Sequence, residues 1–140
     1  MTAPNPDYDA FIRRVIATMP ALRSLGIEVV DLAPGHAEVR LPERAELAQH
    51  DGYVQGGLIG TLADVAGGCA TATLLPAGWV GMTADYTVKL VAPARGTLTA
   101  RGRVVSARRT TSVAAADVLD ADGTVCATAL VTMRNVDTGR

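Results

Sequence analysis

The chain has 140 residues, of which 49% are hydrophobic and 19% charged, so it can bury a core as one domain spanning residues 1–140. Its formal net charge is −1, and it has no basic block, which argues against nucleic acid as the main partner. No stretch predicts a secretory signal or a membrane span, so we expect a cytoplasmic protein with no membrane partner.

The N-terminal segment predicts one short helix. Residues 1–6 contain two prolines, and we expect them to be disordered. Residues 8–19 predict an amphipathic helix because apolar side chains recur there at helical spacing, at Phe11, Val15 and Met19. Pro20 is expected to end this helix, since a proline in a helix interior removes a backbone hydrogen bond.

Two strands and a long helix follow along the chain. Residues 26–32 and 36–41 predict a pair of strands joined by the turn signal Pro34-Gly35. Residues 56–75 form the most helix-like stretch, which ends before Pro76. Its apolar residues lie nearly all the way round, which is typical of a buried helix rather than a surface helix.

The C-terminal half predicts four strands. Residues 82–90 alternate with a period of two, which places Thr83 and Asp85 on the same face of their strand. Turn signals separate three further strands over residues 97–107, 110–119 and 124–134. Because the strands are grouped rather than alternating with helices, we expect an antiparallel sheet and an α+β fold, in which the sheet covers one buried helix.

Asp64 is the only charged residue between Gly52 and Ala84. A lone carboxylate in an apolar helix is costly unless it is paired or hydrogen-bonded. One interpretation is structural, with a backbone amide or an arginine from elsewhere as its partner. The other is functional, because burial raises the pKa of a carboxyl and nearby donors lower it, and together they can make it a base or nucleophile near neutral pH.

The paired glycines Gly56 and Gly57 open the predicted helix. Backbone N–H groups at a helix start have no intrahelical acceptor, and the helix dipole adds positive potential there. Such amides can hold a carbonyl oxygen as it becomes an oxyanion, although a plain tight turn explains the glycines equally well. Gly56 and Asp64 lie roughly 12 Å apart along a helix, so a site that uses both is expected at a subunit interface.

The motif Gln49-x-x-Gly52-x-x-Gln55-Gly56-Gly57, followed by Leu62-Ala63-Asp64-x-Ala66, resembles the PaaI-like hotdog thioesterases. The family pattern is Asn-x-x-Gly-x-x-His-Gly-Gly, with an aspartate eight residues after the first paired glycine. Asp64 has that spacing from Gly56. The resemblance covers residues 20–134, whereas glutamine replaces the usual asparagine at Gln49 and the usual histidine at Gln55.

The resemblance implies a hotdog fold and hydrolysis of acyl-CoA thioesters to free acid and CoA, without a metal or other cofactor, in a homodimer or homotetramer. Asp64 would be the nucleophile or general base, and the Gly56 amide would polarise the carbonyl. Thr83 lies where the family often has a hydroxyl that orients water. Gln49 and Gln55 can hold substrate or water through their amides but cannot act as acid or base.

Other polar residues are weaker candidates. Gly57 and Gln55 flank the oxyanion position and are assigned to substrate binding. Arg108 and Arg109 have the geometry to bind CoA phosphates, although a solvated turn explains them as well. His50 is expected to be a solvated loop residue, and no cluster of cysteine and histidine predicts a metal site.

Two other functions remain open from the sequence. A non-catalytic acyl-CoA binding or sensing module of the same fold is compatible with Gln55 in place of histidine. A hotdog dehydratase or hydratase is disfavoured, because such enzymes usually pair a histidine with an acid, and no histidine lies on the helix of Asp64.

Overall fold

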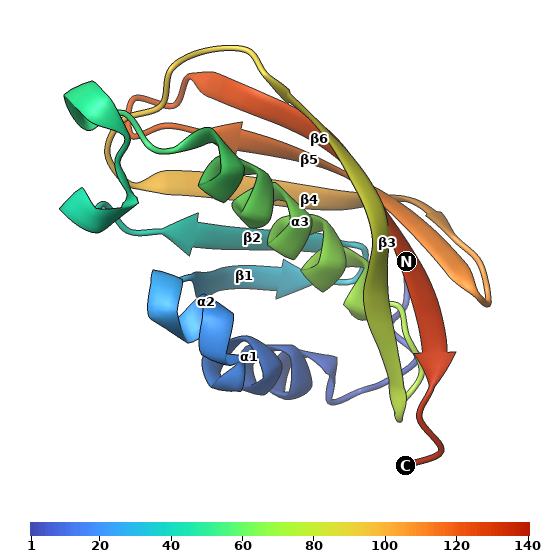
Figure 1. Ribbon diagram of the computed structural model, residues 1–140. Helices are drawn as coiled ribbons and strands as arrows, with labels where there is room; N and C mark the ends of the chain where they lie inside the picture. The colour runs from blue at the N-terminus through green and yellow to red at the C-terminus, as the bar shows by residue number, and fades with distance from the viewer.

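The long apolar helix of the sequence is α3 (Gly56–Ala72), and a six-stranded sheet curves around it (Figure 1). The computed structural model describes all residues 1–140. The strands are β1 (Glu28–Ala33), β2 (His36–Leu41), β3 (Trp79–Leu90), β4 (Leu98–Ala107), β5 (Thr111–Leu119) and β6 (Val125–Asp137). They pair antiparallel in the order β1-β2-β4-β5-β6-β3, so β1 and β3 are the edges. The expected α+β architecture is confirmed.

Glycine allows α3 to lie very close to the sheet. A Cβ on Gly102 of β4 would collide with the backbone carbonyl of Ala66, and one on Gly67 would approach the Cβ of Val131 at 2.8 Å. Leu62, Ala63 and Ala66 on the same helix are completely buried. The small residues of α3 are therefore explained by close packing, which buries it as its uniform apolar pattern predicts.

The N-terminal region forms two helices instead of one. Helix α1 spans Tyr8–Thr18, and Pro20 begins a second helix, α2 (Pro20–Leu25). Proline is tolerated in a first helical turn because its missing N–H has no acceptor there. The expectation that Pro20 only stops a helix is therefore incomplete. Gly26 adopts φ +75° as the left-handed cap of α2, so β1 begins only at Glu28.

Both α1 and α2 lie beside the sheet on the side of α3 (Figure 1). Residues 1–6 contain no helix or strand. Two short 3-10 turns, η1 (Ala45–Leu47) and η2 (His50–Gly52), form the connection that leads into α3. No helix of the fold is both long and apolar enough to cross a membrane.

Strands β3 and β6 extend beyond their predicted ends. Trp79 pairs with Asp137, Val80 with Val136 and Gly81 with Asn135, so the paired region is three residues longer on each strand than the sequence predicts. The alternation of residues 82–90 in the sequence is not matched by alternating burial in this chain, because residues 82–87 are all exposed. This long, exposed edge strand contains Thr83, one of the predicted site residues.

Candidate active site

Asp64 lies near the middle of α3 with its side chain half-buried. The Thr83 hydroxyl on β3 donates a hydrogen bond of 2.8 Å to Asp64 Oδ1. No arginine or lysine forms an ion pair with this carboxylate. The partner of Asp64 is therefore a neutral hydroxyl rather than the structural cation or backbone amide considered from the sequence.

A β-bulge brings Thr83 to Asp64. The pairing of β3 with β6 shifts between Thr83 and Asp85, so that Thr83 is opposite Met133 while Asp85 is opposite the adjacent Thr132. Adjacent residues of a strand point to opposite faces, so the bulge places Thr83 and Asp85 on opposite faces of the sheet. The prediction that strict alternation puts both on one face is wrong.

Burial controls the acid strength of the site. Partial removal from water raises the pKa of Asp64 above its usual value, and the Thr83 hydrogen bond offsets only part of this rise. Burial, with a contribution from the charge of Asp64, raises the pKa of the nearby Cys69 thiol to about 12. That thiol is protonated at neutral pH and is a poor nucleophile, so Asp64 is the group available for chemistry.

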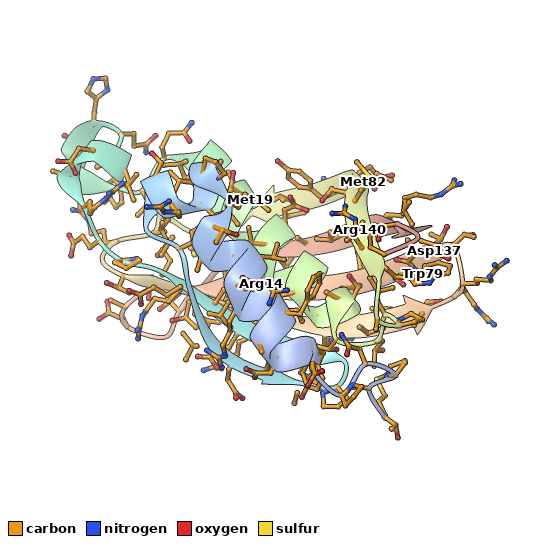
Figure 2. The ribbon with its side chains drawn as sticks, turned by 90° about the horizontal axis from the view of Figure 1, so that it is seen from below. Arg14, Met19, Trp79, Met82, Asp137 and Arg140 are labelled. Carbon is orange, nitrogen blue, oxygen red and sulfur yellow. The ribbon has the colours of Figure 1, made fainter.

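Asp64 and Thr83 lie in the wall of an apolar cavity of about 410 Å³. Helix α1 lines one side of it and β3 the other, with α3 between them. Figure 2 shows this arrangement from below, with Met19 at the end of α1 and with Met82 and Trp79 on β3. Of the 19 lining residues 14 are hydrophobic, so the carboxylate faces an environment suited to an apolar ligand.

Gly56 and Gln49 lie together beside a second hollow of about 510 Å³. Gly56 is the first residue of α3, and its N–H has no acceptor within the chain. A Cβ on Gly56 would approach Leu90 Cδ1 at 2.9 Å, so the glycine also allows the end of β3 to contact the helix start. The free amide and the helix dipole make this a suitable place for a developing negative charge.

Gln55 caps α3. Its Oε1 accepts a hydrogen bond of 3.0 Å from the Leu58 N–H, as an N-cap side chain does. The Gln55 side-chain NH₂ makes no hydrogen bond within the chain and is exposed. Gly57 follows it at the exposed surface, where a Cβ would approach Gln55 Oε1 at 2.9 Å. The sequence pattern alone does not predict this capping role.

The two groups of site residues are separate within one chain. The cavity of Asp64 and Thr83 shares no lining residue with the hollow of Gln49 and Gly56. Both Gly56 and Asp64 belong to the straight run of α3, roughly 12 Å apart along its axis. One reacting carbonyl group therefore cannot contact both residues of the same subunit.

Arg108 and Arg109 lie in the exposed turn between β4 and β5. The buried Asn135 side chain donates a 2.9 Å hydrogen bond to the Arg108 carbonyl oxygen and anchors the turn. The guanidinium carbon of Arg109 lies 5.9 Å from the centre of the Trp79 ring, which lines the cavity of Asp64. Neither arginine forms an ion pair, so both guanidinium groups can bind an anion.

A third arginine, Arg95, has no signal in the sequence that marks it as a site residue. The Arg95 guanidinium carbon lies 3.8 Å from the centre of the Tyr53 ring, and Tyr53 lines the hollow beside Gly56. No motif links these residues because folding alone brings them together. His50 is exposed in η2 and contacts neither site, and no group of three His, Cys, Asp or Glu side chains could hold a metal ion.

Solved structures match this fold over nearly the whole chain. A thioesterase-family protein of Silicibacter pomeroyi has a TM-score of 0.88 at 28% identity, covering 93% of this chain and 98% of that protein. The PaaI protein of the E. coli phenylacetic acid degradation operon has a TM-score of 0.85 at 18% identity, covering 96% of each chain. A Halobacterium salinarum protein named as a proposed esterase is 35% identical over an alignment of 129 positions, which covers 84% of this chain and 85% of that protein.

The fold and these relatives define the class of the protein as hotdog-fold thioesterases, which are hydrolases. The hotdog fold and the PaaI-like resemblance expected from the sequence are thereby confirmed. Within that class the chain belongs to the family described as a domain of unknown function, DUF4442, whose sequence profile matches residues 8–136.

Proposed function

We propose that this protein hydrolyses acyl-CoA-type thioesters to a free acid and CoA, at sites formed between two subunits. The observation that carries the proposal is the Asp64 carboxylate, which has a raised pKa and a hydroxyl partner and faces an apolar cavity. A carboxylate placed beside an apolar cavity can act on the carbonyl of an apolar acyl group.

Asp64 serves as general base or as nucleophile, and both routes need its ionised form. As a base, it takes a proton from water while the water oxygen bonds to the thioester carbon; the C–S bond then breaks, and the thiolate of CoA takes the proton back. As a nucleophile, its oxygen bonds to the thioester carbon and CoA leaves, after which water hydrolyses the resulting anhydride. Thr83 orients the carboxylate in either route.

The oxyanion formed in either route is stabilised by the Gly56 amide of the partner subunit. Within one chain this amide is too far from Asp64, and it has no acceptor of its own. Gln49 lies beside Gly56, so its amide group can bind the thioester or the attacking water. Gln55 and Gly57 complete the helix start that faces the substrate.

A homodimer formed by the edge strand β3 brings these groups together. An exposed edge of 12 residues with unpaired backbone groups favours addition of another strand. Antiparallel pairing centred between Tyr86 and Thr87 places the partner subunit's Leu90 opposite Thr83. Since Leu90 contacts Gly56 within each chain, the Gly56 end of one subunit then approaches Asp64 of the other.

The phosphates of CoA are assigned to arginines with no ion-pair partner. Arg109 lies near Trp79 of the Asp64 cavity, Arg108 precedes it in the same turn, and Arg95 stacks on Tyr53 of the hollow beside Gly56. Arginine binds phosphate through paired hydrogen bonds, which makes these residues suitable anchors for the nucleotide end of CoA. The natural setting for such a substrate is the cytoplasm.

The test is thiol release from a panel of acyl-CoAs by wild type, Asp64→Asn and Asp85→Asn. Asp64→Asn keeps an oxygen for the Thr83 hydroxyl and should lower turnover at least about 100-fold with unchanged folding. Asp85→Asn removes a carboxylate from the opposite face of the same strand and should retain activity. Tight binding of acyl-CoA by wild type without thiol release would instead indicate a non-catalytic binding module.

A further inference from the structure

The cavity of Asp64 collects the largest and most polarisable apolar side chains of the chain. Aromatic residues make up only 4% of the sequence, yet the single phenylalanine and the single tryptophan both line this cavity. Three of the four methionines line it as well. The residues concerned are Phe11, Trp79, Met19, Met82 and Met133. Such a concentration is typical of a ligand site, and methionine adapts its shape to different apolar ligands.

The polar groups of the cavity are gathered at one wall. Thr61 lies one helical turn before Asp64, and its hydroxyl donates to the Gly57 carbonyl oxygen at 3.1 Å. The Thr83 hydroxyl is used by Asp64, and the Cys69 thiol stays protonated. Among the remaining lining side chains only the Trp79 indole N–H can form a hydrogen bond, so a polar substituent elsewhere on a bound acyl chain would be left without a partner.

The size of the cavity sets the length of chain that it can hold. A cavity of 150 Å³ holds benzene, which corresponds to roughly 25 Å³ for each carbon atom. At that density the volume of about 410 Å³ holds on the order of 16 carbon atoms. An acetyl group would leave most of the space unfilled and would gain little from burial.

The mouth of the cavity is itself apolar. Met19 between α1 and α2 is 40% exposed and Met82 on β3 is 61% exposed, although both are large hydrophobic side chains (Figure 2). A ligand chain that lies between them would cover this surface. The exposed methionines therefore match an occupant that continues the apolar lining rather than a polar group.

We infer that this cavity binds the acyl chain of the substrate and selects unsubstituted medium- to long-chain fatty acyl groups, with Gly68 setting the chain length. The inference rests on the proposed thioesterase function. Gly68 lies one helical turn after Asp64 and lines the cavity, and a Cβ there would meet Met133 Cε at 3.5 Å, an ordinary contact. A larger side chain at this position enters the space that the bound acyl chain would fill.

Binding is measured without catalysis through the fluorescence of Trp79, the only tryptophan. The ligands are S-alkyl-CoA thioethers from two to eighteen carbons, which cannot be hydrolysed. The fluorescence should change on binding, and Kd should fall roughly tenfold for every two methylene groups until the cavity is full, near about 16 carbons. Equal Kd values for the two-carbon and fourteen-carbon ligands, or no fluorescence change, would overturn the inference.

Two substitutions of Gly68 test where the acyl chain lies in the cavity. Gly68→Leu should shorten the best-bound ligand by about four carbons, and Gly68→Ala should shorten it by about one. Thr128→Leu adds an apolar side chain on the exposed face of β6, away from the cavity, and should leave the preference unchanged. An unchanged preference in both Gly68 variants would contradict the location.

The failure of the inference and that of the proposed function are distinguishable. Length-dependent binding by wild type, with no hydrolysis of the matching acyl-CoA, would overturn the thioesterase proposal and leave the acyl cavity in place. Hydrolysis of acetyl-CoA and of tetradecanoyl-CoA with equal kcat/KM would support the thioesterase and overturn the selective cavity.

Discussion

At the scale of single residues, the chemistry depends on one carboxylate and one hydroxyl. Partial burial raises the pKa of the Asp64 carboxyl above that of an aspartate in water. The hydrogen bond that Thr83 donates to Oδ1 lowers the pKa and so offsets part of this rise. Both proposed routes use the ionised form, so activity is lost as the pH falls through this raised pKa. The acidic limb of the pH–rate profile should therefore lie above the usual pKa of an aspartate.

Thr83→Val should move this acidic limb to higher pH. The change removes the hydrogen bond that lowers the pKa of Asp64, while the shape of the side chain is kept. Thr83→Ser keeps the hydroxyl and should leave the limb in place. The measurement is kcat/KM against pH for the three proteins, and a limb that moves equally in both variants would contradict this role of Thr83.

The arginines make a separate prediction about the leaving group. One of two variants, Arg95→Gln or the double change Arg108→Gln and Arg109→Gln, should raise KM for an acyl-CoA by about tenfold or more. The variant with this effect is the one that removes the phosphate-binding arginines. The same variants should not affect an acyl-pantetheine, which carries no phosphate. Arg103→Gln, an exposed arginine without an ion pair, is the control. Equal losses on both substrates would show that phosphate binding is not involved.

At the scale of elements, the position of α3 depends on glycines in the sheet and in the helix. Gly102→Ala should lower the free energy of unfolding by about 1–3 kcal/mol, because its Cβ would collide with the Ala66 carbonyl. Gly68→Ala meets only an ordinary contact and should raise the free energy by up to about 1 kcal/mol through helix propensity. Urea unfolding measures both, and a neutral Gly102→Ala would contradict the close packing.

The elements also show what the sequence can predict. The six strands and α3 follow from the apolar periodicity of the sequence and from its turn signals. Helix α2 does not, because Pro20 is equally compatible with a stop and with a first turn. The bulge at Thr83 depends on the register with β6, and the covering of the cavity by α1 depends on tertiary packing. Both features involve segments that are distant in the sequence, so neither can be predicted from one segment alone.

Part of the candidate site can also be predicted from the sequence, and part of it cannot. The spacing of Gly56 and Asp64 is visible in the sequence, as is the conclusion that one subunit cannot use both. The hydroxyl partner of Asp64 follows only from the fold, since strict alternation misplaces the residues around Thr83. The stacking of Arg95 on Tyr53 has no sequence signal at all.

At the scale of the whole molecule, the proposed site requires a second copy of the chain. One subunit offers an apolar cavity with a carboxylate, and the outer edge of its long strand β3 remains unpaired. Pairing along β3 would cover exposed apolar residues of that strand, of which Tyr86 is 44% and Leu90 55% exposed. Two symmetric sites then form in each dimer, each with residues of both subunits.

The most direct test is to mix Asp64→Asn with Gly56→Pro and to let the subunits re-associate. Proline at this first helical position removes the N–H and adds a Cβ that meets Leu90 as an alanine Cβ would, and the extended conformation of Gln55 is compatible with proline. Gly56→Ala keeps the N–H and is the matched control. Each variant alone should be nearly inactive, whereas the mixture should recover about a quarter of wild-type activity, because half of the dimers carry one intact site. A mixture that exchanges subunits but stays inactive would contradict a site shared between Asp64 of one subunit and Gly56 of the other.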